Sequence, residues 1–171
     1  MAQKEAKVKE TRAKEGKYLT FKLGDEEYGL QIHKVIEIIG MQDITPVPRT
    51  PDHLRGVINL RGIIHPVIDL NKKFGMGMTE ETDLTCIIVV TVERDEKQEQ
   101  MGIIVDAVSE VEDIEQENIE DTPSLGTNIN TEFILGMAKT KGTVKMLLDL
   151  QKILSKQDLN VISRVSDTKN N

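Results

Sequence analysis

The chain has 171 residues, a formal net charge of −7, 38% apolar residues, 3% aromatic residues and no tryptophan. This length suits one domain or two small domains that share a core, and that core must be built from Ile, Val, Leu and Met. The acidic balance argues against nucleic acid or an anionic membrane surface as a partner, because those partners need clustered Lys and Arg.

The single cysteine and the absence of long apolar stretches give further bounds. Cys86 begins the apolar run 86–90, which predicts a small buried residue and excludes an internal disulfide framework. No stretch approaches the roughly 18 apolar residues of a membrane span, and no apolar segment follows the lysine-rich N-terminus to make a signal peptide. We expect a soluble, cytoplasmic protein.

The first part of the chain predicts a tail followed by strands. Residues 1–16 are charged and hold almost nothing large and apolar, so a disordered tail is expected. Alternating apolar residues over 19–23 and 28–32 predict two strands, and a third is expected over 35–39. Closely spaced prolines over 46–51 then predict a stiff, extended connector.

The stretch Gly56–Leu70 predicts a β-hairpin. It holds two apolar runs separated by Asn-Leu-Arg-Gly, and Gly62 can adopt the positive φ that a tight reversal needs. Asp69 is expected to cap a short helix over 70–74.

This hairpin occurs twice in the chain. Gly136–Leu150 repeats Gly56–Leu70 at an offset of 80 residues, and Met101–Val111 repeats Tyr28–Ile38 at an offset of 73. Internal repetition of this kind predicts two copies of one structural unit. Asp149 is then expected to cap a second short helix, as Asp69 does the first.

The fold prediction follows from the content of each copy: three strands, a long loop, a hairpin and a short helix. Five short antiparallel strands avoid exposed edges by curling into a small barrel. We therefore predict a mainly β protein of two packed five-stranded SH3-like barrels with short helices. Barrel one is expected over about 17–80 and barrel two over about 83–156, with any exchange of strands between them left open, and 157–171 as a C-terminal tail.

The sequence offers no catalyst, metal site or cofactor site. The three histidines, His33, His53 and His65, have no second ligand at metal spacing. The chain lacks a Gly-rich phosphate loop, a nucleophile elbow and a His-Glu-x-x-His pattern. The run Glu110–Asp121 holds seven acids and no basic residue, and it is expected to be a solvated loop and short helix.

Two surface features are candidates for binding. The face of Ile63, His65 and Val67 is more apolar than its repeat, and Pro66 lacks a backbone donor, which together predict an edge or bulged strand that docks a partner. Packing of that face against the second barrel is an equal alternative. Glu37 and Arg61 keep their charge signs in the repeat, so they are expected to brace the third strand against the hairpin; the alternative is that Arg61 reaches a partner.

Several segments resemble the CheW family of bacterial chemotaxis coupling proteins, over about residues 17–156. The similar segments are Phe21–Leu30, Val35–Ile38, Thr45–Pro48, Gly56–Gly62 and Pro66–Leu70. CheW-like domains also occur at the end of the histidine kinase CheA and in CheV. This sequence holds no kinase, phosphotransfer or receiver segment, so the stand-alone adaptor is the most similar member.

The resemblance implies a non-enzymatic scaffold without a cofactor. It would join the cytoplasmic tips of chemoreceptors to the CheW-like regulatory domain of CheA, in arrays at the inner face of the membrane, without entering the membrane or binding nucleic acid. By resemblance the receptor's helical hairpin lies between the barrels. The implied receptor-binding residues are Val35, Glu37, Ile39, Asn59, Arg61 and Val108, and the implied kinase-binding residues are Val47, Ile63 and His65.

Three other functions remain open at this point. One is a CheW-like scaffold of another two-component pathway. A small-molecule-binding or hydrolytic barrel would require a deep pocket with convergent polar groups between the barrels. A nucleic-acid-binding SH3-like protein would require a basic stripe, which the acidic charge disfavours.

Overall fold

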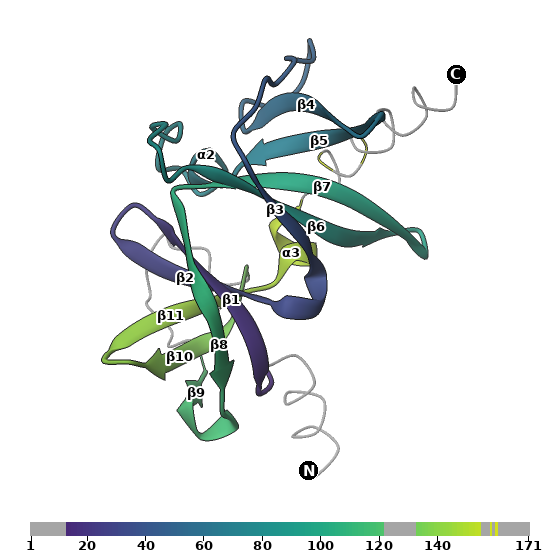
Figure 1. Cartoon of the computed structure of the whole chain (residues 1–171). Coiled ribbons are helices and arrows are strands. Elements are labelled where there is room, and N and C mark those ends of the chain that lie inside the picture. The colour runs from purple at the N-terminus through teal and green to yellow at the C-terminus, as the bar shows by residue number, and fades with distance from the viewer. Residues whose placement is uncertain (1–12, 122–132, 155–157, 159, 161–171) are drawn as a thin grey trace.

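The computed structural model describes residues 13–121, 133–154, 158 and 160, and its strands form two sheets (Figure 1). The six-stranded sheet, here sheet A, has the order β8-β1-β2-β11-β10-β9. Its strands are β1 (Gly16–Leu23), β2 (Glu26–Gln31), β8 (Ala107–Ile114), β9 (Ile119–Glu120), β10 (Ile134–Thr140) and β11 (Thr143–Leu148). The protein is mainly β, as predicted.

The five-stranded sheet, here sheet B, has the order β3-β6-β7-β5-β4. Its strands are β3 (Val35–Gly40), β4 (Leu54–Leu60), β5 (Ile63–Asp69), β6 (Cys86–Arg94) and β7 (Lys97–Val105). Short helical turns join the strands: η1 (Ile32–Lys34), α2 (Leu70–Lys73), η2 (Gln116–Asn118) and α3 (Leu150–Ile153). No helix in these described ranges is long and apolar enough to cross a membrane.

The two repeats exchange their first hairpins. The hairpin β1–β2 pairs with β8 and β11 of the second repeat, while β6–β7 pairs with β3 and β5 of the first. The sheets therefore do not divide into residues 17–80 and 83–156. The reason is local: the three-residue turn η1 carries the chain from β2 in sheet A to β3 in sheet B, and Asp106 alone carries it back from β7 to β8.

Two equivalent parallel contacts hold the exchanged hairpins. Gly29 of β2 lies opposite Leu147 of β11, and Gly102 of β7 lies opposite Val67 of β5. A Cβ on Gly29 would stand 2.9 Å from a methyl of Leu147, and one on Gly102 would stand 2.7 Å from a methyl of Ile87. The repeated glycines are thus needed for close strand packing.

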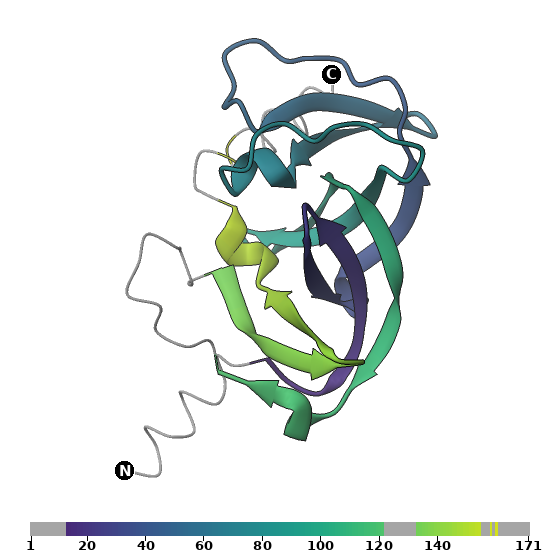
Figure 2. The same ribbon diagram turned by 90° about the vertical axis from the view of Figure 1, so that its left-hand side faces the viewer.

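Three apolar clusters fill the part of the molecule that the structure describes. The largest lies between the sheets and draws residues from both, including Leu19 and Phe21 of sheet A and Ile88 and Ile103 of sheet B. A second cluster lies within the curl of sheet B and a third within the curl of sheet A. Each sheet thus curls around a cluster of its own, and the largest cluster lies where the two sheets pack together. Figure 2 shows sheet B above sheet A.

The turns and caps of the two repeats match the prediction. Arg61 and Gly62 have φ of 52° and 85°, and Lys141 and Gly142 have φ of 52° and 77°, as two-residue hairpin turns with both central residues at positive φ require. The carboxylates of Asp69 and Asp149 each accept from a backbone N–H of the helix that follows.

Strand β5 is an inner strand, so the predicted edge or bulge at Pro66 is wrong. It lies between β4 and β7, and its bulge with β4 falls farther on, opposite Leu54 and Gly56. Val57 lies opposite Pro66, and its backbone N–H donates to the carbonyl of Thr45 while its carbonyl accepts from the N–H of Thr45. The missing donor of Pro66 therefore costs the β4–β5 ladder no hydrogen bond.

The acidic run contains the expected short helix, η2, but its first part and the start of the chain differ from the prediction. Residues 110–114 continue β8, and Glu112 is only 6% exposed. The described structure begins at Ala13, which is buried and donates its backbone N–H to Leu135 at 3.2 Å, so residues 13–16 are not a free tail. The rest of the expected tails lies outside the described residues, except Asp158, whose buried carboxylate pairs with Lys73 at 3.0 Å, and Asn160.

Candidate binding seam

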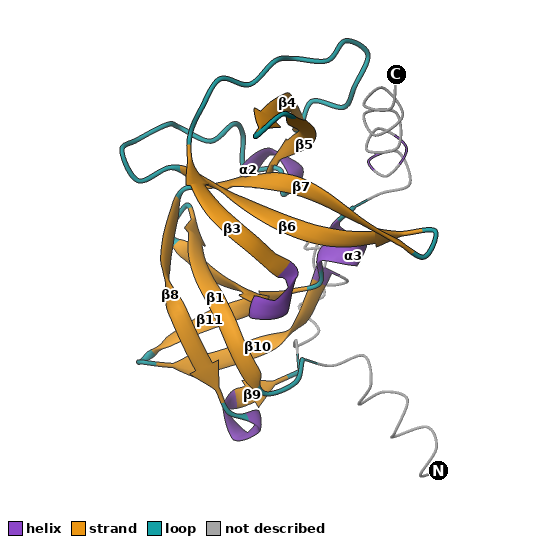
Figure 3. Ribbon diagram, turned by 45° about the vertical axis from the view of Figure 1, so that its right-hand side comes forward, coloured by secondary structure: helices purple, strands orange, loops and turns teal. Residues whose placement is uncertain are grey.

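The edge strands β3 and β8 occupy equivalent places in the two repeats: β3 lies at one edge of sheet B, and β8 lies at one edge of sheet A (Figure 3). The two strands approach each other at Cys86, which lies opposite Gly40 of β3 and hydrogen-bonds the backbone of Val108 of β8. Val35 and Val108, at equivalent positions, both pack against the core between the sheets. We call this region, formed by β3 and β8, the seam.

A bulge in each edge strand turns the seam residues. In β3 the register shifts after Val35, and in β8 it shifts after Val108, so each edge strand carries one extra residue at the same point of the repeat. The hydroxyl of Thr20 fills the second bulge, accepting from the N–H of Glu110 and donating to its carbonyl. β-Bulges change the direction of side chains at sheet edges, and here they determine the direction of Glu37 and Glu110.

The seam carries exposed aliphatic side chains. Ile36, Ile38 and Val111 are 47%, 45% and 50% exposed. Ile38 lies opposite the core residue Ile88, and Val111 lies opposite the core residue Leu19, so both share a sheet face with the core between the sheets. The apolar core thus continues outward to the molecular surface along both edge strands, which is typical of a protein-binding surface.

Matched ion pairs flank the seam. Arg61, at the tip of the β4–β5 hairpin, donates from Nη2 to Glu37 of β3. Lys141, at the tip of the β10–β11 hairpin, donates from Nζ to Glu110 of β8, and that hydrogen bond raises the pKa of Lys141. The predicted brace between the third strand and the hairpin is confirmed in both repeats. Both cations remain largely exposed, so a partner can reach them.

The structure gathers five of the six residues implied for the receptor contact around the seam. Val35 and Val108 border it, and Glu37 and Arg61 flank it. Asn59 is exposed at the same hairpin tip, where its Oδ1 accepts from the N–H of Gly62 at 2.8 Å and holds the turn. The sixth residue also belongs to β3, but its side chain packs inward.

That sixth residue is Ile39, which packs against the cluster within the curl of sheet B. The bulge and the alternation of β3 bring its neighbours Ile36 and Ile38 to the surface instead. Sequence reasoning missed these two residues and Val111, because it did not identify β3 and β8 as edge strands. Alternation within 35–39 was the available signal, since it separates Ile36 and Ile38 from Glu37 and Ile39.

The residues implied for the kinase contact are only partly at the surface. Ile63 is 47% exposed at the start of β5, and Val47 is half-buried in the proline-rich loop, where its carbonyl accepts from the hydroxyl of Thr50. His65 is only 6% exposed, because β5 is an inner strand covered on the barrel side. The expected outward face of β5 is therefore limited to its first residue.

The described residues show little that would serve a small-molecule enzyme. They contain no group of three or more His, Cys, Asp or Glu side chains placed to hold a metal ion. The pocket between the sheets beside α3 has a volume of about 290 Å³, near the lower limit for small-molecule sites, and a larger pocket of about 490 Å³ is open and lined mainly by charged and polar side chains. Burial raises the pKa of the Cys86 thiol, which lowers its reactivity.

Comparison with known proteins identifies the relatives of this fold. The CheW-like domain family matches residues 17–158. The chemotaxis protein CheW of Klebsiella aerogenes is 36% identical over 149 residues, 87% of each chain, and that of Treponema pallidum is 34% identical over 151 residues, 86% of each chain. The crystal structure of the scaffolding protein TtCheW from Thermoanaerobacter tengcongensis aligns with a TM-score of 0.73 and 39% identity, covering 84% of this chain and 95% of that one.

Proposed function

Because the chain belongs to the CheW-like domain family, we propose that it is a chemotaxis adaptor that couples the cytoplasmic tips of chemoreceptors to the histidine kinase CheA. The observation that supports this proposal most strongly is the seam. It combines exposed aliphatic side chains on two edge strands with a matched ion pair on each flank. Such a surface binds another protein and performs no chemistry.

The receptor contact is proposed at the seam. A receptor tip is a helical hairpin, and one of its helices would place apolar side chains at i, i+3 and i+4 against Ile36, Ile38 and Val111. Arg61 and Lys141 would then meet carboxylates or carbonyls at the sides of that helix. An arginine is suited to this role because its planar group donates several directed hydrogen bonds.

The kinase contact is proposed at the hairpin and loop of sheet B. Ile63 and Val47 supply the accessible apolar surface there, and buried His65 supports the strand beneath Ile63. The receptor contact then lies along β3 and β8, and the kinase contact extends from Ile63 to the proline-rich loop, so the two contacts adjoin at the tip of the β4–β5 hairpin and one adaptor can hold both partners side by side. In arrays, many modest contacts of this kind gain strength through multivalency.

The coupling itself requires only fixed geometry. An adaptor that binds one conformational state of the receptor better than another passes that bias to the kinase through the shared assembly. No covalent step is involved. The site of action would be the receptor array at the cytoplasmic face of the membrane.

Single apolar-to-glutamate substitutions test this assignment. In a pull-down, Ile38→Glu is expected to stop binding a receptor helical-hairpin fragment and still to bind the regulatory domain of CheA. Ile63→Glu is expected to stop binding that CheA domain and still to bind the receptor fragment. Leu84→Glu is the matched control, because Leu84 is 70% exposed and lies outside both surfaces. Full receptor binding by Ile38→Glu, with circular dichroism unchanged, would remove the seam from the receptor contact.

A further inference from the structure

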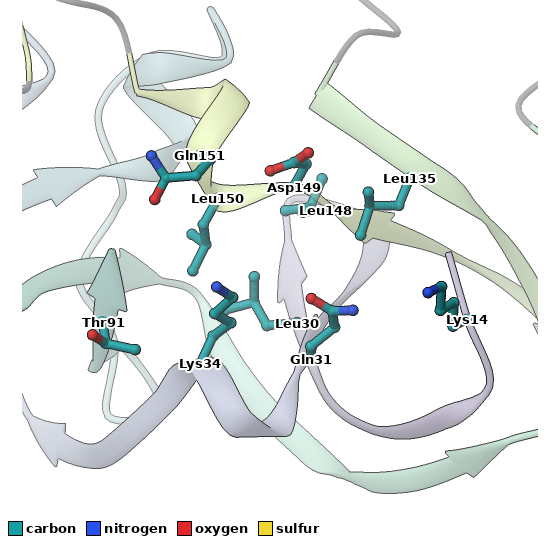
Figure 4. A pocket seen from close by; sticks show the side chains of 10 residues that line it. All are labelled: Lys14, Leu30, Gln31, Lys34, Thr91, Leu135, Leu148, Asp149, Leu150 and Gln151. Atoms are coloured by element: carbon teal, nitrogen blue, oxygen red, sulfur yellow. The ribbon is translucent and has the colours of Figure 1, made fainter. Parts of the chain in front are cut away.

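The pocket of about 290 Å³ between the sheets lies beside α3, where η1, β6 and the start of β10 meet (Figure 4). In that view Lys34, Gln31 and Lys14 lie along one side of the pocket, and Leu150, Leu148 and Leu135 lie along the other. Gln151 bonds both the N–H and the C=O of Glu93 in β6, at 2.6 and 2.8 Å, and so holds α3 at the edge of that strand. The pocket belongs to neither surface proposed above.

The internal repeat shows how the equivalent place is filled at the other helix. Asp69, the counterpart of Asp149, is fully buried and accepts from the backbone N–H of Thr79 at 3.0 Å and from its hydroxyl at 2.7 Å. Arg55 donates to the same carboxylate at 3.2 Å. A segment of the chain without regular secondary structure, with the sequence Gly-Met-Thr-Glu-Glu-Thr over 77–82, thus covers the carboxylate at the start of α2.

Asp149 has no such cover within the described part of the chain. Its side chain is half-buried and accepts from the backbone N–H of Lys152 at 3.3 Å, a bond internal to the helix cap. Beyond α3, the buried Asp158 pairs with Lys73 and His53 at sheet B. The carboxylate of Asp149 is left with capacity for donors of the kind that Thr79 supplies to Asp69.

The charge of the pocket favours an acidic occupant. Lys14 and Lys34 both line it, and neither has an ion pair to any other described residue. The two lysines lie on the same side of the pocket, with Gln31 between them (Figure 4). In the segment 77–82 that covers Asp69, Thr79 is followed directly by Glu80 and Glu81. A similar segment at this pocket would therefore bring carboxylates toward Lys14 and Lys34.

We propose that this pocket binds an extended segment of a partner protein in which a Thr or Ser is followed by acidic residues. The hydroxyl and backbone N–H of the Thr or Ser donate to Asp149, as those of Thr79 do to Asp69. The acidic side chains that follow pair with Lys34 and Lys14. Specificity arises because the carboxylate of Asp149 repels an acid at the first position, while the lysines attract acids at the next ones.

The test uses a synthetic peptide, acetyl-Gly-Met-Thr-Glu-Glu-Thr-amide, titrated into the full chain and followed by amide and methyl NMR shifts. Saturable shifts are expected at Gln31, Lys34 and Leu150. Replacing the Thr at the third position by Val, or both Glu by Gln, is expected to weaken binding about tenfold, the loss for one charge-assisted hydrogen bond.

Protein variants separate this site from the rest of the surface. Lys34→Glu is expected to weaken peptide binding about tenfold or more, as is Asp149→Asn, which keeps a capping side chain. Lys22→Glu, an exposed lysine on β1, is the charge-matched control and is expected to bind as the wild type. Shifts that map elsewhere, or equal binding by Lys34→Glu and wild type, would overturn the proposal.

The outcome is independent of the proposed receptor contact. Lys34→Glu is expected to retain the receptor fragment, and Ile38→Glu is expected to retain the peptide. If Lys34→Glu lost the receptor fragment as well, the pocket would be part of the receptor contact and the separate site would be wrong. If Ile38→Glu failed to bind the receptor fragment and the peptide did not bind the wild-type protein, the proposed peptide site would be wrong and the proposed receptor contact would stand.

Discussion

Arg61 and Lys141 occupy the same position in the two repeats: each begins a two-residue turn at φ 52°, and each pairs with a glutamate on an edge strand. The pairs differ in the cation alone. Arginine offers several donors in a plane, whereas lysine is a compact charge. This difference suggests that the two flanks of the seam are not equivalent in recognition.

Arg61→Asp is expected to abolish receptor coupling and to leave the fold intact. The Arg61 side chain is exposed, and an exposed ion pair contributes less than about 1 kcal/mol to stability. Aspartate also tolerates the positive φ of this turn position. A receptor pull-down combined with thermal unfolding measures both effects.

Lys141→Asp is the matched control, because it makes the same change in charge at the equivalent turn. It is expected to weaken receptor binding less than Arg61→Asp. Unchanged receptor binding by Arg61→Asp would leave Arg61 as a brace only.

Gly56→Ala is expected to destabilise the protein by roughly 2–4 kcal/mol, as strained or overpacked sites do. Gly56 has φ of 144°, and a Cβ there would stand 2.1 Å from the carbonyl oxygen of Thr45. That oxygen is bonded to the N–H of Val57, so the loop cannot move away without losing the bridge.

Gly24→Ala serves as the comparison for Gly56→Ala, because Gly24 also has positive φ but has open space around it. It is expected to cost only about 1 kcal/mol, the conformational part of the effect. Equal costs for the two variants in urea unfolding would show that the contact with Thr45 does not matter.

Asp69→Ala is expected to cost more stability than Asp149→Ala. The Asp69 carboxylate is fully buried and accepts from Lys72, Thr79 and Arg55, so its removal leaves several donors unsatisfied and should cost about 3 kcal/mol or more. Asp149 is half-buried and mainly a helix cap, which is worth about 1 kcal/mol. Chemical denaturation of both variants checks the order, and a reversed order would contradict the burial of Asp69.

The features that sequence reasoning predicted are those set by local rules. The turns at Gly62 and Gly142, the caps at Asp69 and Asp149 and the repeat itself follow from residue type and spacing within a few positions. The brace between Glu37 and Arg61 was accessible because the repeat carries the same pair of charges. Local signals sufficed for each of these.

The features that were missed depend on which strands pair across the chain. The exchange of hairpins decides that β5 is an inner strand, and so it decides that His65 is buried. The same exchange makes β3 and β8 the edges that expose Ile36, Ile38 and Val111. The alternation within 35–39 separates the two faces of β3, but it does not report which strands lie beside β3, so the exposure of these positions depends on information that is not local.

Cys86 is expected to react slowly with iodoacetamide near neutral pH. Burial raises the pKa of its thiol above the ordinary value of 9.0, so less thiolate is present at a given pH. The alkylation rate of the native protein should keep rising above pH 9, and it should be lower at pH 8 than that of the protein unfolded in urea. Equal rates for native and unfolded protein at pH 8 would show that the thiol is not protected.

Lys145 and Glu112 form a buried ionic network inside sheet A, where the equivalent position of sheet B holds His65. Lys145 Nζ lies 3.6 Å from Glu112 and 3.4 Å from Glu27, and it donates to the carbonyl of Thr140 at 2.9 Å. The hydroxyl of Thr140 donates to Glu112 at 2.8 Å. Lys145→Met is expected to cost about 3–5 kcal/mol, because it leaves the Glu112 carboxylate buried without its cation.

The double variant Lys145→Met with Glu112→Gln should be less destabilised than the sum of the two single variants, because neither charge is then left alone in the interior. The coupling is measured by a double-mutant cycle in urea, with the m-value checking that the unfolding transition stays comparable. Lys139→Met with Glu120→Gln is the control cycle, since that pair lies on the exposed surface of the same sheet and should show almost no coupling. Additive costs for the buried pair would mean that Lys145 is held by Thr140 and Glu27, and that its charge does not act on Glu112.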